Sequence, residues 1–165
     1  MQHLQNQRKT VCLRVHPEQD NICGKKARQF LYSRGKSAHF AAALFYMMDV
    51  IRSILLFSWR REDYIIFVRY LMGTAYLPAP MHKIAYHFFA LIVPKTETKF
   101  FLDVSPKEAA FRIRTSRQKQ EMFEDIDDLK KVRAKALSLA YSNDWIIINS
   151  NIPATEVSTK IRQAL

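Results

Sequence analysis

Tyr64–Tyr70 (YIIFVRY) is the stretch that decides the fold of this chain. Five residues suited to a buried strand end abruptly in Arg69 and Tyr70, and a segment of helical character follows. In an open parallel α/β sheet, ligands bind at the carboxyl ends of the strands. The planar guanidinium group of Arg69 is suited to a two-point grip on a phosphate. The run therefore predicts a strand that ends in an anion-binding residue, although Arg69 could instead pair with a carboxylate at the sheet edge.

Three further stretches have the composition of strands, and helices are expected between them. The predicted strands are Thr10–Val15, Lys99–Val104 and Trp145–Ile148. The predicted helices are Gly24–Tyr32, Ser37–Trp59, Leu71–Leu77, Met81–Val93, one that starts at Ser105-Pro106, one along the apolar stripe Ile126–Ala140, and Pro153–Leu165. Strands separated by helices form a parallel sheet that is covered on both faces. The predicted fold class is therefore α/β, with a three-layer parallel sheet flanked by helices.

Length and composition indicate one globular domain. The chain has 165 residues, of which 48% are apolar and 25% charged, so a disordered chain is excluded. Cys12 and Cys23 have neither metal-ligand spacing nor a disulfide framework, and we expect a reduced, cytoplasmic setting. The polar first residues predict no secretory signal. The longest apolar stretch, Ala38–Trp59, carries Asp49 and Arg52, so we expect a helix buried in a soluble protein rather than a membrane span.

The net charge of +11 indicates an anionic partner. Nucleic acid, a membrane surface or the phosphates of a nucleotide would each satisfy it, and charge alone does not choose among them. A solvated basic surface without a partner is an equally good explanation.

A second basic group is formed by Arg112, Arg114 and Arg117. It lies at a predicted helix end that leads into a polar loop. Such arginines could form a mobile lid over polyphosphate, where they would offset the charge of the transferring oxygens. A solvated basic helix end is at least as good an interpretation of the spacing.

The long apolar helix supplies a third group, made of Phe45, Asp49 and Arg52. Aromatic residues on an apolar helix are more often part of the core than a platform for a base. Arg52 could reach a phosphate or form an ion pair. The histidines show no metal-binding pattern, and we expect no metal site built by them.

In their order, several motifs resemble the thymidylate kinase family of P-loop nucleoside monophosphate kinases. The resemblance covers about Thr10 to Leu165. It rests on His16-Pro17, Leu44-Phe45, Val68-Arg69-Tyr70 (at the family's Asp-Arg-Tyr), Phe100–Ala109 (FFLDVSPKEA), Glu121–Glu124 (EMFE) and Lys131-Val132-Arg133.

The resemblance implies transfer of the γ-phosphoryl group of ATP, with Mg²⁺, to a deoxynucleoside monophosphate such as dTMP. Arg69 would hold the acceptor phosphate and Phe45 would stack on the base. The other implied substrate-binding residues are Tyr70, Arg52 and Tyr76, and the implied lid residues are Arg112, Arg114 and Arg117. The family commonly forms homodimers through helices, a role that Ala38–Trp59 could serve, although burial in the core explains its composition equally well.

The largest departure from the family is the absence of the phosphate-binding loop. No G-x-x-x-x-G-K-[ST] motif occurs, and Gly35-Lys36-Ser37 lacks both the first glycine and a preceding strand. The family's first strand, its loop and most of a helix, about two dozen residues at typical element lengths, are therefore expected to be missing. The family strand order 2-3-1-4-5 places the missing strand between Tyr64–Val68 and Lys99–Val104.

Three single positions also depart. Val68 replaces the aspartate that helps to organise magnesium, and Ala75-Tyr76 comes one residue early. Asp49 stands where an arginine is usual, and Arg52, one turn later, could substitute for it. We therefore expect a single thymidylate kinase-like domain over residues 1–165 that is incomplete at its N-terminus. It should contain a lid-like segment at about 112–124. We expect this chain to be inactive as a kinase. The alternative is a non-catalytic remnant or a basic nucleic-acid-binding module. A third interpretation is that the reading frame extends upstream of Met1.

Overall fold

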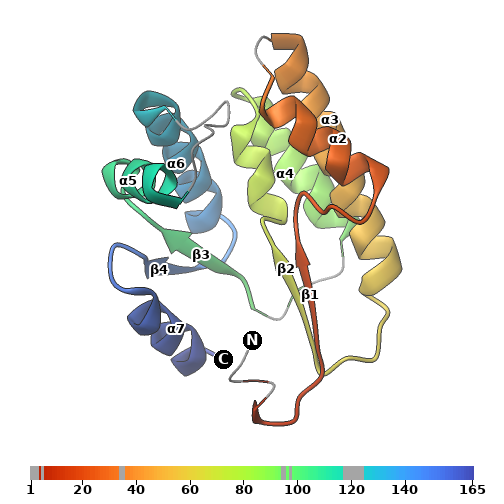
Figure 1. Cartoon of the computed structure of the whole chain (residues 1–165), viewed down its shortest axis with the longest axis vertical. Helices are drawn as coiled ribbons and strands as arrows, with labels where there is room; N and C mark the ends of the chain where they lie inside the picture. The colour runs from red at the N-terminus through yellow and green to blue at the C-terminus, as the bar shows by residue number, and fades with distance from the viewer. Residues whose placement is uncertain (1–3, 5, 34–35, 94–95, 97, 117–124) are drawn as a thin grey trace. The chain divides into compact units, whose positions relative to one another are not determined.

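The computed structural model describes residues 4, 6–33, 36–93, 96, 98–116 and 125–165. The chain divides into two compact units (Figure 1). The first consists of Met1–Thr74 with His87–Pro94, and the second of Ala75–Tyr86 with Lys95–Leu165. The expectation of a single domain stays a prediction.

The first unit is a parallel strand pair joined by two helices. Its elements are β1 (Val11–Val15), α2 (Ile22–Leu31), α3 (Lys36–Phe57), β2 (Tyr64–Val68), most of the 3-10 helix η1 (Leu71–Tyr76) and the second half of α4 (Met81–Ile92). β1 and β2 run parallel, with Val11 opposite Tyr64 and Val15 opposite Val68. Parallel strands need a long crossover connection, which α2 and α3 supply.

The second unit repeats this plan. It contains the first half of α4 and five complete elements. These are β3 (Phe100–Asp103), α5 (Pro106–Ser116), α6 (Ile126–Tyr141), β4 (Ile146–Asn149) and α7 (Ala154–Gln163). β3 and β4 are parallel, with Phe100 opposite Ile146 and Asp103 opposite Asn149. The core of this unit includes Tyr86 and Leu139, both almost completely buried.

The predicted strands and helices are confirmed in position and type, with ends that differ by a few residues. The Tyr64–Val68 prediction matches β2 at both ends, but the expected burial is wrong, because Tyr64 and Val68 are exposed and the three residues between them are only half-buried. Leu71–Leu77 is helical, but of the 3-10 type. The mixed α/β class with parallel pairing is confirmed, and the strands among the described residues form two separate two-stranded sheets, β1-β2 and β3-β4. No described ladder joins β2 to β3, the two strands between which the sequence places the gap. A three-layer P-loop arrangement stays a prediction.

Side-chain caps explain where several helices begin. The side chain of Asn21 accepts a hydrogen bond from the amide of Gly24 at 2.9 Å and starts α2. Ser105 accepts from the amide of Glu108 at 3.3 Å, as the Ser-Pro-x-Glu pattern predicts. Asp125 accepts from the amide of Asp127 at 2.9 Å at the start of α6. These caps satisfy amide groups that the first helical turn leaves without a partner.

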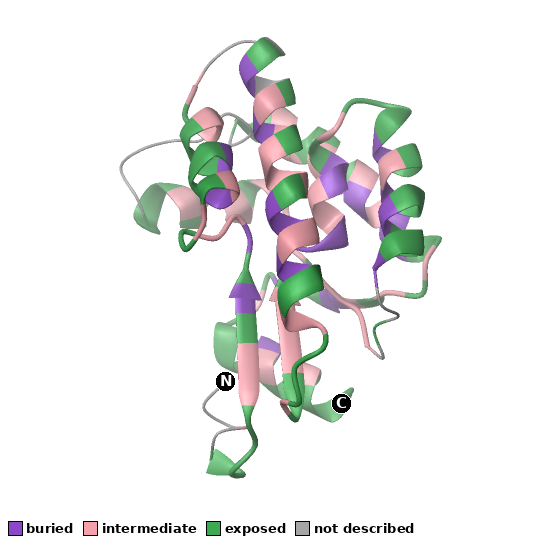
Figure 2. Ribbon diagram, turned by 90° about the vertical axis from the view of Figure 1, so that its right-hand side faces the viewer, coloured by how far each residue is buried: buried purple, intermediate pink, exposed green. Residues whose placement is uncertain are grey.

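The expectation that the Ala38–Trp59 helix is buried is wrong for one of its faces (Figure 2). By length and composition, Phe40–Phe57 is apolar enough to cross a membrane, but only 28% of that window is buried inside the protein. The buried face includes Asp49, whose carboxylate is hydrogen-bonded inside the first unit. The composition of a helix does not reveal which neighbour covers each face, so the sequence could not show the exposed stripe. The apolar side chains exposed on α3 are Phe40, Leu44, Met48, Leu55 and Leu56.

Candidate functional site

The carboxyl ends of β1 and β2 meet at one edge of the first sheet. Val15 lies opposite Val68, and the amide of His16 donates to the carbonyl oxygen of Val68 at 3.2 Å. The ladder thus continues one residue beyond the strands and brings His16 beside Arg69 and Tyr70. Two of the predicted site residues therefore lie at the position where α/β folds bind ligands.

Arg69 has a left-handed backbone and an exposed side chain. Its φ is 57°, a conformation that costs a non-glycine residue about 1–3 kcal/mol. Within the part of the chain that the structure describes, no carboxylate pairs with its guanidinium group. The alternative of an edge ion pair is therefore not observed there. The guanidinium group of Arg69 is therefore accessible to an anion at the end of β2.

Tyr70 forms part of a stack of rings beneath this edge. The ring of Phe67 lies parallel to His16, with centroids 6.2 Å apart and an interplanar angle of 9°. Phe67 also stacks on Tyr70 at 5.2 Å. Tyr70 is buried, and burial raises the pKa of its hydroxyl group. The buried hydroxyl group keeps its proton, and the substrate-binding role of Tyr70 stays a prediction.

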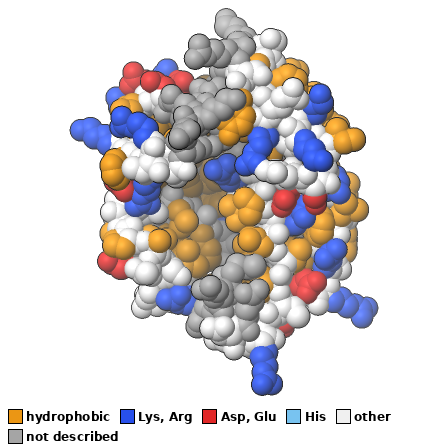
Figure 3. Space-filling view, viewed as in Figure 1, with side chains coloured by type: hydrophobic (Ala, Val, Ile, Leu, Met, Phe, Trp, Pro, Cys, Tyr) orange, Lys and Arg blue, Asp and Glu red, His pale blue; other side chains and the backbone are white. Residues whose placement is uncertain are grey.

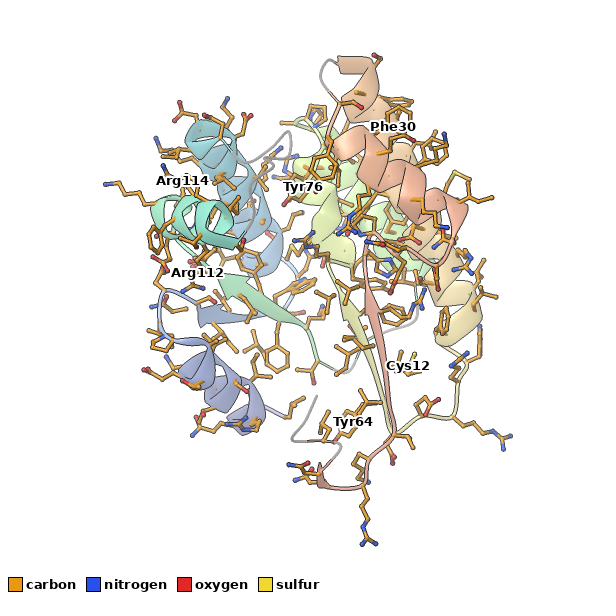
Figure 4. The ribbon with its side chains drawn as sticks, in the orientation of Figure 1. Cys12, Phe30, Tyr64, Tyr76, Arg112 and Arg114 are labelled. Atoms are coloured by element: carbon orange, nitrogen blue, oxygen red, sulfur yellow. The ribbon has the colours of Figure 1, made fainter. Side chains whose placement is uncertain are left out.

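Phe45 lies on α3 with one face of its ring already covered. It stacks on Phe30 of α2, with centroids 5.8 Å apart and an interplanar angle of 10°; Figure 4 labels Phe30 on its helix. Both rings are half-buried. Only the face of Phe45 away from Phe30 remains for a base.

Arg52 takes part in a network of charged groups around Asp20. Its guanidinium group lies 3.5 Å from one oxygen of Asp20, and Arg14 lies 2.8 Å from the other. Hydrogen bonds from Asn21 and then Arg14 lower the pKa of Asp20. Of the two interpretations of Arg52, the structure shows the ion pair, with Asp20 as the partner. A long, exposed ion pair of this kind contributes little to stability.

The sequence singled out Asp49 beside Phe45 and Arg52 and as a departure from the family pattern, but it did not predict the partners of the Asp49 carboxylate. Its carboxylate is completely buried and accepts hydrogen bonds from His16 Nδ1 (3.0 Å), the amide of Glu18 (2.8 Å) and the side chain of Asn21 (2.6 Å). Burial alone would raise the pKa of Asp49, but these hydrogen bonds outweigh it and lower the pKa. The signal available in the sequence was a carboxylate inside the longest apolar stretch.

The remaining predicted site residues belong to the second unit. Tyr76 ends η1 and is 45% exposed, and Arg112 and Arg114 lie on α5 (Figure 4). Arg112 donates to Glu108 at 2.7 Å, while Arg114 donates to the carbonyl oxygen of Ala110 at 3.3 Å. Arg117 and the rest of the predicted lid, up to residue 124, lie outside the described residues. Their substrate-binding and lid roles stay predictions.

The second unit also contains a two-point ion pair that the sequence did not predict. Arg133 of α6 donates from Nε and one Nη to the two oxygens of Asp103, both at 2.7 Å. The hydrogen bond to Asp103 raises the pKa of Arg133. The pair anchors the carboxyl end of β3 to α6, where a two-point geometry adds specificity.

The residues present do not fit ATP and Mg²⁺, which the family resemblance implies. The position expected to carry a magnesium-organising carboxylate is Val68, an apolar residue that is 38% exposed. The 165 residues contain no glycine-rich loop to hold polyphosphate. In the described part of the chain, no group of three or more His, Cys, Asp or Glu side chains could hold a metal ion. What the described residues do show is an exposed arginine at the end of β2.

Comparison with known proteins relates this chain to one family of enzymes. The family model described as Thymidylate kinase matches residues 1–161. A curated protein named probable thymidylate kinase, from Pyrobaculum calidifontis (strain DSM 21063 / JCM 11548 / VA1), is 35% identical over 104 residues. That match covers 61% of this chain and 53% of the relative, so the chain spans about half the length of the curated relative it matches.

Proposed function

This chain belongs to the thymidylate kinase family, and from that premise we propose that it is a cytoplasmic protein that binds a deoxynucleoside monophosphate, dTMP in the first instance. The observation that carries the proposal is Arg69. It is exposed, left-handed and free of any described carboxylate, at the edge where β1 and β2 both end.

Binding in this site rests on charge and stacking. The guanidinium group of Arg69 donates two N–H groups to two oxygens of the monophosphate, a geometry that lysine does not reproduce. The face of Phe45 opposite Phe30 stacks on the pyrimidine. Tyr70, buried against Phe67, keeps the strand end rigid rather than contacting the ligand. In this proposal Arg69 binds the phosphate group of the nucleotide and Phe45 binds its base.

We further propose that the chain by itself does not catalyse phosphoryl transfer. Transfer depends on electrostatic stabilisation of the γ-phosphoryl group, which the glycine-rich loop supplies in P-loop kinases. This chain has neither that loop nor a carboxylate at Val68. Among the described residues we find neither a glycine-rich loop nor a group of carboxylates that could take over these roles, so the acceptor would bind without a reaction.

Purified chain is expected to bind dTMP and to show no dTMP-dependent turnover of ATP. Binding would be measured by isothermal titration calorimetry, and turnover by a coupled ADP-release assay. Turnover of about 1–100 per second, the usual range of kinases, would contradict the proposed inactivity. Thymidine, which lacks the phosphate, is the control ligand and is expected to bind much more weakly, since Arg69 would have nothing to hold.

A nucleic-acid-binding role is the second reading of the positive charge, and no specific contact favours it. Lys and Arg side chains are scattered among other residue types on the face seen in Figure 3. Among the described residues, several Lys and Arg side chains pair with a carboxylate, as Arg14 does with Asp20 and Arg133 does with Asp103. Binding of DNA or RNA that weakens steeply with salt, without any preference for a mononucleotide, would favour this reading instead.

We propose that the first unit forms a homodimer through the exposed face of α3. Large apolar side chains follow one another at helical spacing along that face, among them Phe40, Leu44 and Met48. A shallow depression of about 370 Å³ continues the face toward α2. It is lined by Cys23, Met48, Ile51, Arg52, Leu55 and Leu56. A contiguous apolar surface of this kind is typical of a protein–protein contact.

Leu44→Glu is expected to weaken self-association roughly 100-fold, because a carboxylate would be desolvated at the centre of the contact. Sedimentation equilibrium over a range of protein concentrations measures the dissociation constant of the dimer. Thr155→Glu adds the same charge on the exposed first turn of α7 and should leave the association unchanged. A wild-type chain that is monomeric at high concentration would contradict the dimer.

A further inference from the structure

The carboxylate of Asp49 is turned toward the loop that follows β1. Asp49 lies on α3, yet its three described partners all belong to the segment His16–Asn21, 28 to 33 residues away in sequence. Its side chain is 0% exposed. An arginine that bound a ligand from this position would have to extend out of the protein. The carboxylate of Asp49 instead makes all its described contacts inside the protein.

Two of the three partners, the amide of Glu18 and the side-chain N–H₂ of Asn21, can only donate, and together with the lowered pKa they favour the anionic form of Asp49. One oxygen accepts from His16 Nδ1 and from the amide of Glu18, and the other accepts from the side-chain amide of Asn21 at 2.6 Å. An ionised carboxylate only accepts, so it suits these two donors, of which one lies on each oxygen. An asparagine would place its own N–H₂ against one of these donors and leave a buried group unsatisfied, which is expensive.

The same bonds fix the tautomer of His16. Asp49 accepts and does not donate, so Nδ1 of His16 must carry the proton. The ring is stacked on Phe67 at an interplanar angle of 9° and is almost fully buried. Its other nitrogen, Nε2, is buried and has no hydrogen-bond partner among the described residues. The orientation of the ring therefore depends on stacking and on Asp49.

The loop held by Asp49 connects directly to the candidate site. The amide of His16 binds the carbonyl oxygen of Val68, the residue before Arg69. Glu18 accepts from the amide of Val15 at 2.8 Å. Asn21, through its side-chain oxygen, caps α2. Asp49 thus sits at the centre of a hydrogen-bonded assembly that joins the ends of both strands to α2 and α3.

We propose that Asp49 is a positioning residue of the acceptor site: its carboxylate fixes the loop His16–Asn21 and, through His16, the end of β2 that presents Arg69. The part concerning the ligand rests on the proposed function. Asp49 occupies a position where an arginine is usual in the proteins that the chain resembles. In this chain the residue supports the site by fixing the loop and does not contact the ligand.

Asp49→Asn tests the proposal through three measurements. In the wild-type chain, long-range ¹H–¹⁵N NMR is expected to show His16 as the Nδ1–H tautomer and slow hydrogen exchange at the amide of Glu18. In the variant, that amide should exchange faster. The affinity for dTMP should fall roughly tenfold or more, because small displacements of positioning groups have effects of this size.

Asp63→Asn is the matched control. Asp63 also accepts from a backbone amide and a side chain, those of Thr10 at 2.8 and 2.9 Å, but at the opposite end of β1. The Asp63→Asn variant should bind dTMP within about twofold of the wild-type affinity, because Asp63 and Thr10 lie at the opposite end of β1 from the site. Equal losses in both variants would reduce Asp49 to a general structural role and overturn the proposal.

The remaining outcomes are also decisive. An Nε2–H tautomer of His16 in the wild-type chain would overturn the proposal, and this measurement needs no variant should Asp49→Asn fail to fold. If the wild-type chain binds no dTMP, the proposed function fails. The tautomer and the exchange of the Glu18 amide then still decide whether Asp49 fixes the loop.

Discussion

Arg69→Ala is expected to weaken the binding of dTMP about 100-fold, because it removes the charged, two-point contact to the phosphate. Arg69 stands at the carboxyl end of β2 with an exposed side chain and no described carboxylate partner. Its loss therefore leaves no charge unpaired inside the protein, and the effect should appear in binding rather than in folding. Calorimetric titration with dTMP, alongside thermal unfolding, separates the two.

Two further substitutions sharpen this result. Arg69→Lys keeps the charge but loses the planar fork, and should recover only part of the affinity. Arg69→Gly removes the side chain and also relieves the left-handed backbone at φ 57°, so it should lose binding while gaining about 1 kcal/mol of stability. If Arg69→Ala bound dTMP as tightly as the wild type, the assignment of the phosphate site would be wrong.

Gly24→Ala is expected to destabilise the first unit by about 3 kcal/mol or more, enough to unfold a chain of ordinary stability. Gly24 is buried in the first turn of α2. A Cβ atom there would overlap the backbone carbonyl oxygen of Glu18 and would lie 2.7 Å from its carbonyl carbon. Backbone atoms cannot rotate aside, so the loop after β1 would have to move. Urea denaturation followed by circular dichroism measures the loss.

Gly73→Ala provides the comparison. A Cβ at Gly73 would lie 2.7 Å from Cζ and the hydroxyl oxygen of Tyr46, a side chain rather than backbone. A ring can shift where a carbonyl group cannot, so a smaller loss of roughly 1–2 kcal/mol is expected. Equal losses at the two glycines would mean that the loop after β1 is more adaptable than its hydrogen bonds to Asp49 indicate.

Much of the fold could be predicted because it is encoded locally. A run of β-branched and aromatic residues predicted β2 to the residue, and a Ser-Pro-x-Glu pattern predicted the start of α5. Parallel pairing followed from the alternation of strands and helices. Since parallel strands end at the same edge, the meeting of His16 and Arg69 also follows from their positions after β1 and β2.

The partners of the site residues could not be predicted in the same way. Phe45 was a candidate for base stacking, but its stacking on Phe30 depends on how α2 packs against α3. Arg112 was a candidate lid residue, and Glu108 one turn earlier holds it at 2.7 Å. Such contacts arise from rotamers and packing, which the spacing of residue types does not specify.

By itself, the sequence determined the order of strands and helices, the arginine at the end of Tyr64–Val68 and the absence of a phosphate-binding loop, because each depends on neighbouring residues only. The tertiary structure decided that one face of α3 is exposed and that Asp49 is turned inward to His16 and Glu18. Burial and hydrogen bonding between residues some thirty positions apart exist only once the elements have packed, since packing alone determines which groups lose contact with water.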